Sequence, residues 1–404
     1  MNSKWEIKKM PEVIEWGSGG TPKATVKEYY ENGDIPWLII GDLNNGIVTK
    51  SETKITKLGL DNSSAKMIPP NTLLVAMYGS IGKLGITGIE CCTNQAIAFA
   101  KKMHGVTTKY MFYYMAMMKS KLISKGKGGT QKNISQTVLN SLDVIVPPLE
   151  EQHRIVTRIE ELFSQLDSGI ETLKKTKEQL KVYRQAVLKE AFESASSSNS
   201  KNLTINDLLT KKKKGMTTGP FGTMLKKHEH QSSGVPVLGI ENIGKDGFVD
   251  GNKIFVSEEK AKELSAFKVD TDDLIISRSG TVGEICIVPP HMKNALLSTN
   301  LMRISLDYDV IRADYFMYLF KSKGVVIDQV KELCKGSTRM FLNQTILKQI
   351  IFPVPTLKIQ AKIIETIESR LSVCDSIEKT IDTALQEAEA LRQSILKQAF
   401  EGGL

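Results

Sequence analysis

The segment VPPLEEQHRIVTRIEELFSQLDSGIETLKKTKEQLKVYRQAVLKEAFE, residues 146–193, decides the expected fold, because a second copy follows it in the chain. That copy, VPTLKIQAKIIETIESRLSVCDSIEKTIDTALQEAEALRQSILKQAFE, occupies residues 354–401. The two align without a gap, so that Gln152 falls on Gln360 and Arg184 on Arg392, each 208 positions later. Agreement over so long a segment indicates an internal duplication.

Each copy has the apolar pattern of a long coiled-coil helix, with branched or aliphatic residues at seven-residue intervals. The residues predicted to pack in the helix seam are Ile155, Ile159, Leu166, Leu173 and Leu180 in the first copy and Ile363, Ile367, Ile377, Ile381 and Leu391 in the second. About 44 residues at 1.5 Å each give a rod of roughly 65 Å. The alternative is that both are ordinary amphipathic core helices.

The remaining chain forms two globular segments that repeat more loosely, at offsets between about 200 and 208 residues. Short apolar runs at Leu73–Ala76 and Leu274–Ser277 predict strands, and Tyr110–Met118 and Tyr315–Phe320 predict buried helices. The expected class is therefore α+β, with mixed α/β domains. The predicted order is a first domain (1–145), a helix (146–193), a Ser-rich linker (194–202), a second domain (203–352) and a second helix (353–404).

Composition places the chain among ordinary globular proteins and gives it a basic excess. The 54 Lys and Arg residues against 45 Asp and Glu residues give a net charge of +9, which suits a phosphate-bearing partner without requiring one. No apolar run exceeds about nine residues, too short for a membrane span. Residues 1–10 lack the apolar stretch of a secretion signal, and five cysteines without a C-x-x-C pair indicate a reducing compartment. We expect a cytoplasmic protein.

The sequence contains no convincing catalytic or metal site. Gly82-Lys83 is followed by Leu84, which does not fit a P-loop, and no G-x-G-x-x-G fingerprint follows a strand. His228 and His230 have no third ligand nearby in the sequence and are best explained as solvated loop residues. We predict no metal, no cofactor and no catalytic residue in this chain.

Glycine-containing loops with hydroxyl and cationic side chains are the candidate binding elements, because backbone amides and cations attract phosphate and Arg or Lys can read guanine. Two such loops occur in each domain, and their members are Ser80, Lys83, Lys127, Thr130, Gln131 and Lys132 in the first and Arg278, Ser279, Lys335, Ser337, Thr338 and Arg339 in the second. The simpler interpretation of any one of them is a structural turn with a solvated charge.

The doubled arrangement of a glycine loop, a Gln, a proline-bearing segment and a long helix resembles the DNA specificity subunit of type I restriction-modification systems. The match is specific at Val146-Pro147-Pro148-Leu149 and its counterpart Val354-Pro355-Thr356-Leu357, and weak inside the globular segments. Lys358-Ile359 departs from Glu150-Glu151 at the start of the second helix.

The resemblance implies two target recognition domains joined by an antiparallel coiled coil with a pseudo-two-fold axis. Each domain would read one half of a split, asymmetric duplex target, and the helices would set the spacing and dock two methyltransferase subunits. Restriction and translocase subunits would join them. S-adenosylmethionine, ATP and magnesium would belong to these partners, so the chain itself would not be an enzyme.

Two other classes of function remain open at the level of sequence. A coiled-coil scaffolding protein with incidental basic charge would bind no specific DNA sequence and would lack a steep salt dependence. A self-contained restriction enzyme is disfavoured by the missing motifs.

Overall fold

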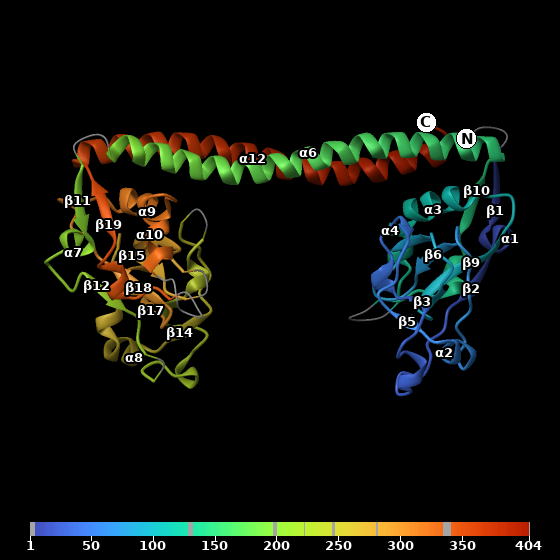
Figure 1. Cartoon of the computed structure of the whole chain (residues 1–404), viewed down its shortest axis with the longest axis horizontal. Helices are drawn as coiled ribbons and strands as arrows, with labels where there is room; N and C mark the ends of the chain where they lie inside the picture. Colours follow the sequence, from blue (N-terminus) through green and yellow to red (C-terminus); the bar gives the residue numbers. More distant parts are fainter. Residues whose placement is uncertain are drawn as a thin grey trace. The chain divides into compact units, whose positions relative to one another are not determined.

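The computed structural model describes residues 5–127, 132–196, 200–221, 223–244, 247–279, 282–333 and 341–403. It divides into two compact units, of which unit 1 comprises residues 1–173 and 382–404 and unit 2 comprises residues 174–381. Each unit therefore contains one globular domain and about half of each long helix (Figure 1). Within the described ranges, no helix combines the length and the apolar character that a membrane span requires.

The domain of unit 1 is a mixed α/β domain built around a five-stranded sheet of order β2-β9-β6-β7-β4. A three-stranded sheet, β5-β3-β8, and the pair β1-β10 complete it. The strands are β1 (Glu6–Lys9), β2 (Ile14–Ser18), β3 (Ile35–Leu38), β4 (Ile47–Val48), β5 (Lys54–Ile55), β6 (Leu73–Ala76), β7 (Leu84–Thr87), β8 (Cys92–Thr93), β9 (Ile97–Met103) and β10 (Asp143–Val146). The helices are α1 (Met10–Val13), α2 (Lys57–Asp61), α3 (Thr108–Met117), α4 (Lys119–Ser124) and α5 (Gln136–Asn140).

The domain of unit 2 repeats this plan with a four-stranded sheet, β12-β18-β15-β16, a three-stranded sheet, β14-β13-β17, and the pair β11-β19. The strands are β11 (Lys201–Thr204), β12 (Met216–Thr218), β13 (Val235–Leu238), β14 (Ile254–Val256), β15 (Leu274–Ser277), β16 (Ile285–Ile287), β17 (Leu296–Leu297), β18 (Leu301–Ile304) and β19 (Ile351–Val354). The helices are α7 (Ile205–Leu208), α8 (Glu258–Glu263), α9 (Ala313–Lys321), α10 (Ile327–Leu333) and α11 (Gln344–Leu347). The predicted strands and buried helices are all present.

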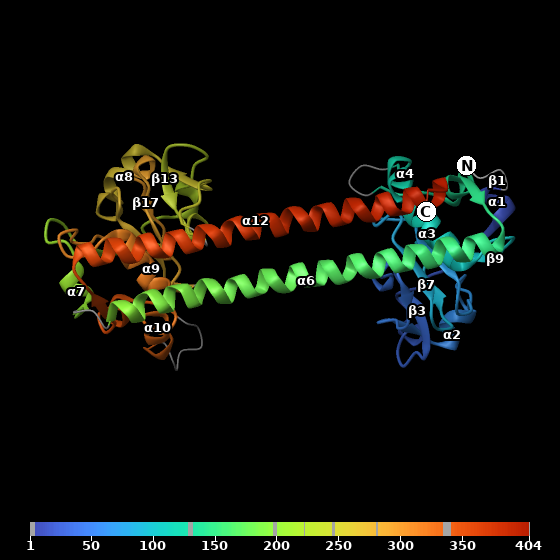
Figure 2. The ribbon, with the colours of Figure 1, turned by 90° about the horizontal axis from the view of Figure 1, so that it is seen from above.

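The long helices are α6 (Leu149–Ser196) and α12 (Leu357–Glu401), and within each unit their segments run side by side in opposite directions (Figures 1 and 2). The predicted fold class, with two α/β domains, an antiparallel helix pair and an internal repeat, is confirmed. The predicted division into domains, helices and linker stays a prediction; in the structure α6 continues through Ser196 and β11 begins at Lys201. Residues 197–199 lie outside the described part of the chain.

The seam between the helices has one row that the sequence predicted and a second row that it did not. Ile159, Leu166, Leu173, Leu180 and Val187 in α6, and Ile367, Cys374, Ile381, Ala388 and Ile395 in α12, are buried or half-buried. The prediction that Ile377 and Leu391 pack in the seam is wrong, since these side chains are 40% and 50% exposed. The second row instead includes Arg184 and its repeat Arg392. Because these residues are charged, an apolar pattern in the sequence could not predict their place in the seam.

The seam arginines form the same ion pair in each unit. Arg184 donates to Asp375 and, at 3.0 Å, to Glu378 Oε2, and Arg392 donates to Asp167. Burial of Arg184 acts against its charged form, but the hydrogen bonds that it donates to both carboxylates, together with the charge of Asp375, outweigh burial and raise the pKa of the guanidinium. In each ion pair the two residue numbers add up to the same total. In an antiparallel pair of helices this means that both ion pairs belong to the same alignment of α6 with α12.

A buried glutamine ties the start of each long helix to its domain. Gln152 accepts a hydrogen bond from Thr107 N at 2.9 Å and donates to Gly105 O at 2.8 Å and Pro147 O at 2.9 Å. Gln360 makes the equivalent three bonds, to Arg312 N, Val310 O and Pro355 O. Both side chains are fully buried, so the helices and domains form one packed body within each unit.

We predict that Gln152→Leu lowers the free energy of unfolding of unit 1 by about 2–4 kcal/mol, because three backbone groups lose the buried side chain to which they are hydrogen-bonded. Urea denaturation and hydrogen exchange at the Thr107 amide measure the effect. Gln179→Leu, the same change at an exposed position of α6, is the matched control and should alter stability by less than about 0.5 kcal/mol. Equal effects of the two changes would show that the Gln152 bonds do not stabilise the junction.

Candidate nucleic-acid interface

The first glycine turn of each domain leaves the central sheet at the same place. The turn after β6 closes with Gly82 N donating to Ala76 O at 3.1 Å, and the turn after β15 closes with Gly283 N donating to Ser277 O at 3.0 Å. Gly82 and Gly283 have φ values of 73° and 88°, a region that favours glycine. The repeated glycines therefore have a structural reason, which is the shape of this turn.

In each domain a described residue just after the second glycine loop bonds to the first turn. Ile134 N donates to Met77 O at 2.8 Å, and Leu342 N donates to Arg278 O at 3.0 Å. In unit 1 the side of the second loop that the structure describes also forms a backbone bridge from Tyr78 to Asn133. Among the described residues, the structure thus joins the end of each second loop to the first turn of the same domain.

The described candidate residues of unit 1 differ in how accessible their side chains are to a ligand. Ser80, Lys127 and Lys132 are exposed, whereas Lys83 is half-buried and its Nζ donates to Ile40 O at 3.1 Å and Gly41 O at 3.3 Å. The ammonium group of Lys83 therefore secures the short 3-10 helix Ile40–Asp42. The candidates Thr130 and Gln131 lie outside the described residues.

In unit 2, Arg278 joins three loops at the end of the sheet. Its Nη1 donates to Thr299 O at 3.2 Å, its Nε donates to Leu342 O at 3.4 Å, and its guanidinium lies 4.6 Å from the ring centroid of Phe341. Burial lowers the pKa of Arg278. Beside it, Ser279 Oγ donates to Asn300 Oδ1 at 3.0 Å. The candidates Lys335, Ser337, Thr338 and Arg339 lie outside the described residues.

A third loop at this end of each sheet escaped the sequence analysis. After β2 and after β12 the chain passes close to the turn before the paired strand, which is β9 in unit 1 and β18 in unit 2. A Cβ atom on Gly19 would lie 2.1 Å from Thr93 O, and one on Gly219 would lie 1.9 Å from Ser298 O. In unit 2 this loop also receives a hydrogen bond from Gln344 Nε2 to Thr218 Oγ1 at 2.9 Å. The sequence does repeat a glycine 200 positions apart, at Gly19 and Gly219. A single glycine, however, does not predict which part of the chain packs against it.

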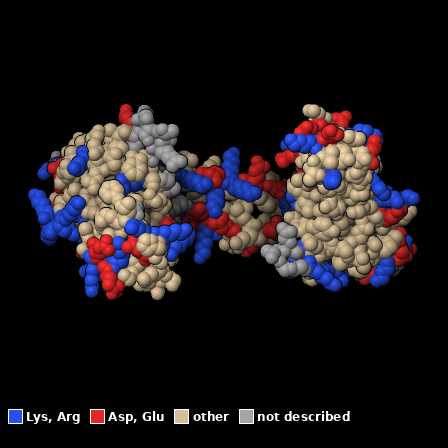
Figure 3. Space-filling model, turned by 90° about the horizontal axis from the view of Figure 1, so that it is seen from below, with Lys and Arg blue, Asp and Glu red and all other residues tan. Residues whose placement is uncertain are grey.

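A group of lysines borders the interface of unit 1. Lys119, Lys121, Lys125, Lys127 and Lys132 belong to α4 and the loop after it, and the ion pairs found among the described residues include none of them. In the view of Figure 3 much of each domain is uncharged, with Lys and Arg side chains in groups at its margins and Asp and Glu side chains among them. Such groups suit phosphate contacts around a neutral, hydrogen-bonding centre.

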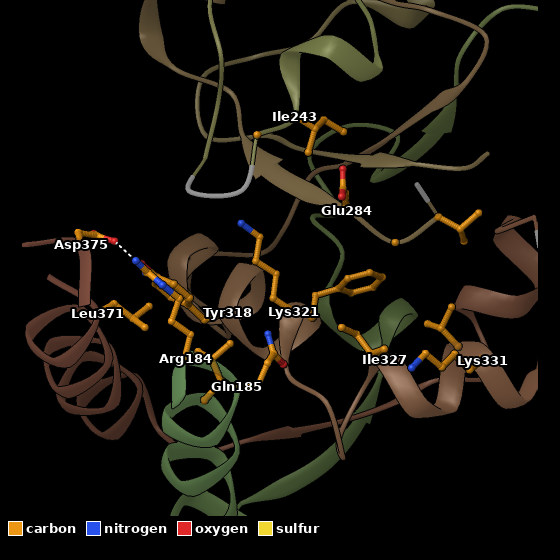
Figure 4. A pocket seen from close by; sticks show the side chains of 16 residues that line it. Arg184, Gln185, Ile243, Glu284, Tyr318, Lys321, Ile327, Lys331, Leu371 and Asp375 are labelled. Atoms are coloured by element: carbon orange, nitrogen blue, oxygen red, sulfur yellow. Dashed lines mark hydrogen bonds and ion pairs between the residues drawn. The ribbon is translucent and has the colours of Figure 1, made fainter. Parts of the chain in front are cut away.

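A cleft separates the domain from the helix pair in each unit. The cleft of unit 2 has a volume of about 560 Å³, and Figure 4 shows Arg184, Gln185, Tyr318 and Leu371 among its lining residues. The cleft of unit 1 has a volume of about 660 Å³. The shared lining residues are Arg184 and Arg392, Gln185 and Gln393, Leu188 and Leu396, Asp375 and Asp167, Tyr318 and Tyr113, and Gly283 and Gly82.

Buried polar atoms in the cleft of unit 2 have no hydrogen-bond partner in the part of the chain that the structure describes. They are Arg184 Nε and Gln185 Oε1, one donor and one acceptor on adjacent residues. The cleft can therefore receive a group that offers both an acceptor and a donor.

Solved structures with the same fold include the HsdS subunit from Thermoanaerobacter tengcongensis, which covers 100% of this chain and 98% of its own at 15% identity with a TM-score of 0.57. A chain from a structure that concerns complex assembly and conformational transition of the type I R-M system has a TM-score of 0.75 at 14% identity, covering 100% of this chain and 99% of its own.

Sequence relatives lead to the same family. The specificity subunit of the type I restriction enzyme EcoKI of Escherichia coli K12 is 23% identical over 404 residues, covering 95% of this chain and 85% of the relative. The EcoBI specificity subunit of Escherichia coli is 26% identical over 358 residues, covering 83% and 74%. The model of the type I restriction modification DNA specificity domain matches residues 2–182 and again residues 198–387. The chain therefore belongs to the type I restriction-modification DNA specificity family, with one copy of the family domain in each half.

Proposed function

We propose that this chain is the DNA-recognition subunit of a type I restriction-modification enzyme, in which each globular domain reads one half of a split, asymmetric duplex target. The observation that carries this proposal is the loop cluster at the end of the central sheet, which occurs in both units with the same backbone connections and different side chains. A repeated scaffold with unlike side chains suits two readers of unlike sequences.

The long helices are proposed to set the distance between the half-sites. Helix α6 has 48 residues and α12 has 45, which corresponds to about 70 Å at 1.5 Å per residue. Repeated ion pairs and a continuous apolar row favour a single register. If α6 and α12 pair in only one register, the proposed distance between the two half-sites has a single value.

Catalysis is proposed to reside in the partners. Two methyltransferase subunits bind this chain, restriction and translocase subunits join them, and S-adenosylmethionine, ATP and magnesium bind to those partners in the cytoplasm. The paired clefts support two equivalent partners, because identical Arg, Gln, Leu, Asp, Tyr and Gly residues line both. Exposed Ile377 and Leu391 remain candidates for the same contacts.

Sequence-specific DNA binding separates this function from that of a scaffolding protein. A selection from random duplexes by the complex of the chain with its modification subunits should enrich a bipartite sequence, and the affinity should fall steeply with salt. Binding without sequence preference would favour the scaffold.

We predict that the two half-sites can be changed independently. When residues 2–143 are replaced by the same region of a relative, the selected target should change in one half-site only, because the loops of each domain are contained within one unit. Deep sequencing of the selected duplexes measures both halves at once. A simultaneous change in both halves would contradict the assignment of one reader to each domain.

A heptad inserted after residue 175 of α6 and another after residue 383 of α12 should lengthen the non-specific spacer. Seven residues keep the apolar row in phase and add about 10.5 Å, which corresponds to about three base pairs of 3.4 Å each. The added pairs also rotate the groove by about a third of a turn, which the domains must absorb. Selection of the preferred site measures the spacing, and an unchanged spacer would show that the helices do not determine it.

We predict that filling one cleft removes one partner. Gln185→Trp in unit 2 and Gln393→Trp in unit 1 should each reduce the number of bound methyltransferase subunits from two to one, as measured by native mass spectrometry. Gln349→Trp, at an exposed position of unit 2, is the control and should retain two. Two subunits bound to the double cleft variant would contradict this docking site.

A further inference from the structure

Phe221 is the most exposed of the large hydrophobic side chains in the described part of the chain, at 75% of its surface. It follows Gly219 and Pro220 in the loop after β12, at the end of the sheet where the candidate DNA-contacting loops of unit 2 meet. An exposed aromatic ring in such a place is available to contact a ligand that offers an apolar group.

The described residues on both sides of Phe221 are anchored to the rest of the domain. On one side Gly219 N donates to Leu301 O at 2.9 Å, and on the other Leu225 packs against the buried cluster that includes Val237 and Val256. Between these anchors Met224 N donates to Phe221 O at 2.8 Å.

The groups around this loop match a nucleic-acid surface. Lys226 and Lys227 follow it and are exposed, and Arg278 lies on the adjoining turn. Ser279 and Asn300 supply hydrogen-bonding groups at the same sheet end. Cations suited to phosphates and polar groups suited to base edges thus lie in loops at the same sheet end as Phe221, whose ring can neither donate nor accept a conventional hydrogen bond.

The equivalent position of unit 1 has a different character. Thr21 stands 200 residues before Phe221, in the loop after β2, and its hydroxyl donates to the Gln95 side chain. The glycines before these residues, Gly19 and Gly219, both lie against the turn before the neighbouring strand. The backbone is therefore repeated while a polar group is replaced by an apolar ring, as expected for positions that differ between two readers.

We propose that Phe221 contacts the 5-methyl group of a thymine in the half-site read by the domain of unit 2. The reason is chemical complementarity, because the thymine methyl is the only apolar group that base pairs offer at the major-groove edge. Phe221 is then a specificity-determining residue that requires an A·T pair at one position. This inference rests on the proposed function and adds a base preference to it.

The test uses the complex of the full chain with its modification subunits and duplexes carrying the selected target. Each thymine of the unit 2 half-site is replaced in turn by deoxyuridine, which removes only the methyl group. At one position we expect the wild-type complex to lose affinity about tenfold. Phe221→Ala should lose about the same on the thymine duplex and nothing further on the deoxyuridine duplex, because both changes remove one contact.

Three outcomes separate this inference from the proposed function. Unchanged affinity of the Phe221→Ala complex, or losses that multiply when the two changes are combined, would overturn the thymine contact while specific binding by the wild type still supports the proposed function. Absence of specific binding by the wild type would instead overturn the proposed function. Ile351→Ala, which truncates another exposed apolar side chain of unit 2, is the control and should leave affinity unchanged.

Discussion

The pairing of α6 with α12 is the interaction on which the rest of the structure depends, because both domains are built onto it. In unit 1 the ring of Phe400 from α12 packs 5.2 Å from that of Tyr110, and in unit 2 Phe192 from α6 packs 5.4 Å from Tyr315. Each domain therefore completes its core with an aromatic side chain from the end of a long helix. The Arg–Asp pairs in the seam hold the register that brings these rings to their positions.

Charged residues in the seam favour one arrangement without adding much stability. A buried arginine loses hydration, and its ion pair restores only part of that energy, so apolar residues in its place are often equally stable. The ion pair favours the antiparallel arrangement over a parallel one. In a parallel pair with each residue beside its repeat, Arg184 would lie against Arg392 and Asp167 against Asp375. The antiparallel arrangement sets each cation against a carboxylate.

Sequence reasoning was sufficient for the fold because the duplication compares the chain with itself. Repeated residues such as Gln152 and Gln360 marked the helix starts, and the structure gives them the same three hydrogen bonds. It was insufficient for the second row of the seam, where Arg184 and Arg392 interrupt the apolar pattern. It selected the loops of the candidate interface, but the neighbours of Gly19 and Gly219 depend on strand pairing between distant segments, which composition does not encode.

The discontinuity of unit 1 has a consequence for synthesis on the ribosome. Its domain is made before unit 2, yet Leu396, Ala399 and Phe400 belong to its buried cluster and are made after unit 2. Until they arrive, the faces of Tyr110 and Tyr114 that Phe400 covers are open to water or to other nascent chains. Unit 2 is one continuous segment, residues 174–381, so its folding does not depend on a later part of the chain. The order of translation thus leaves the earlier domain incomplete until the C-terminal part of α12 is made.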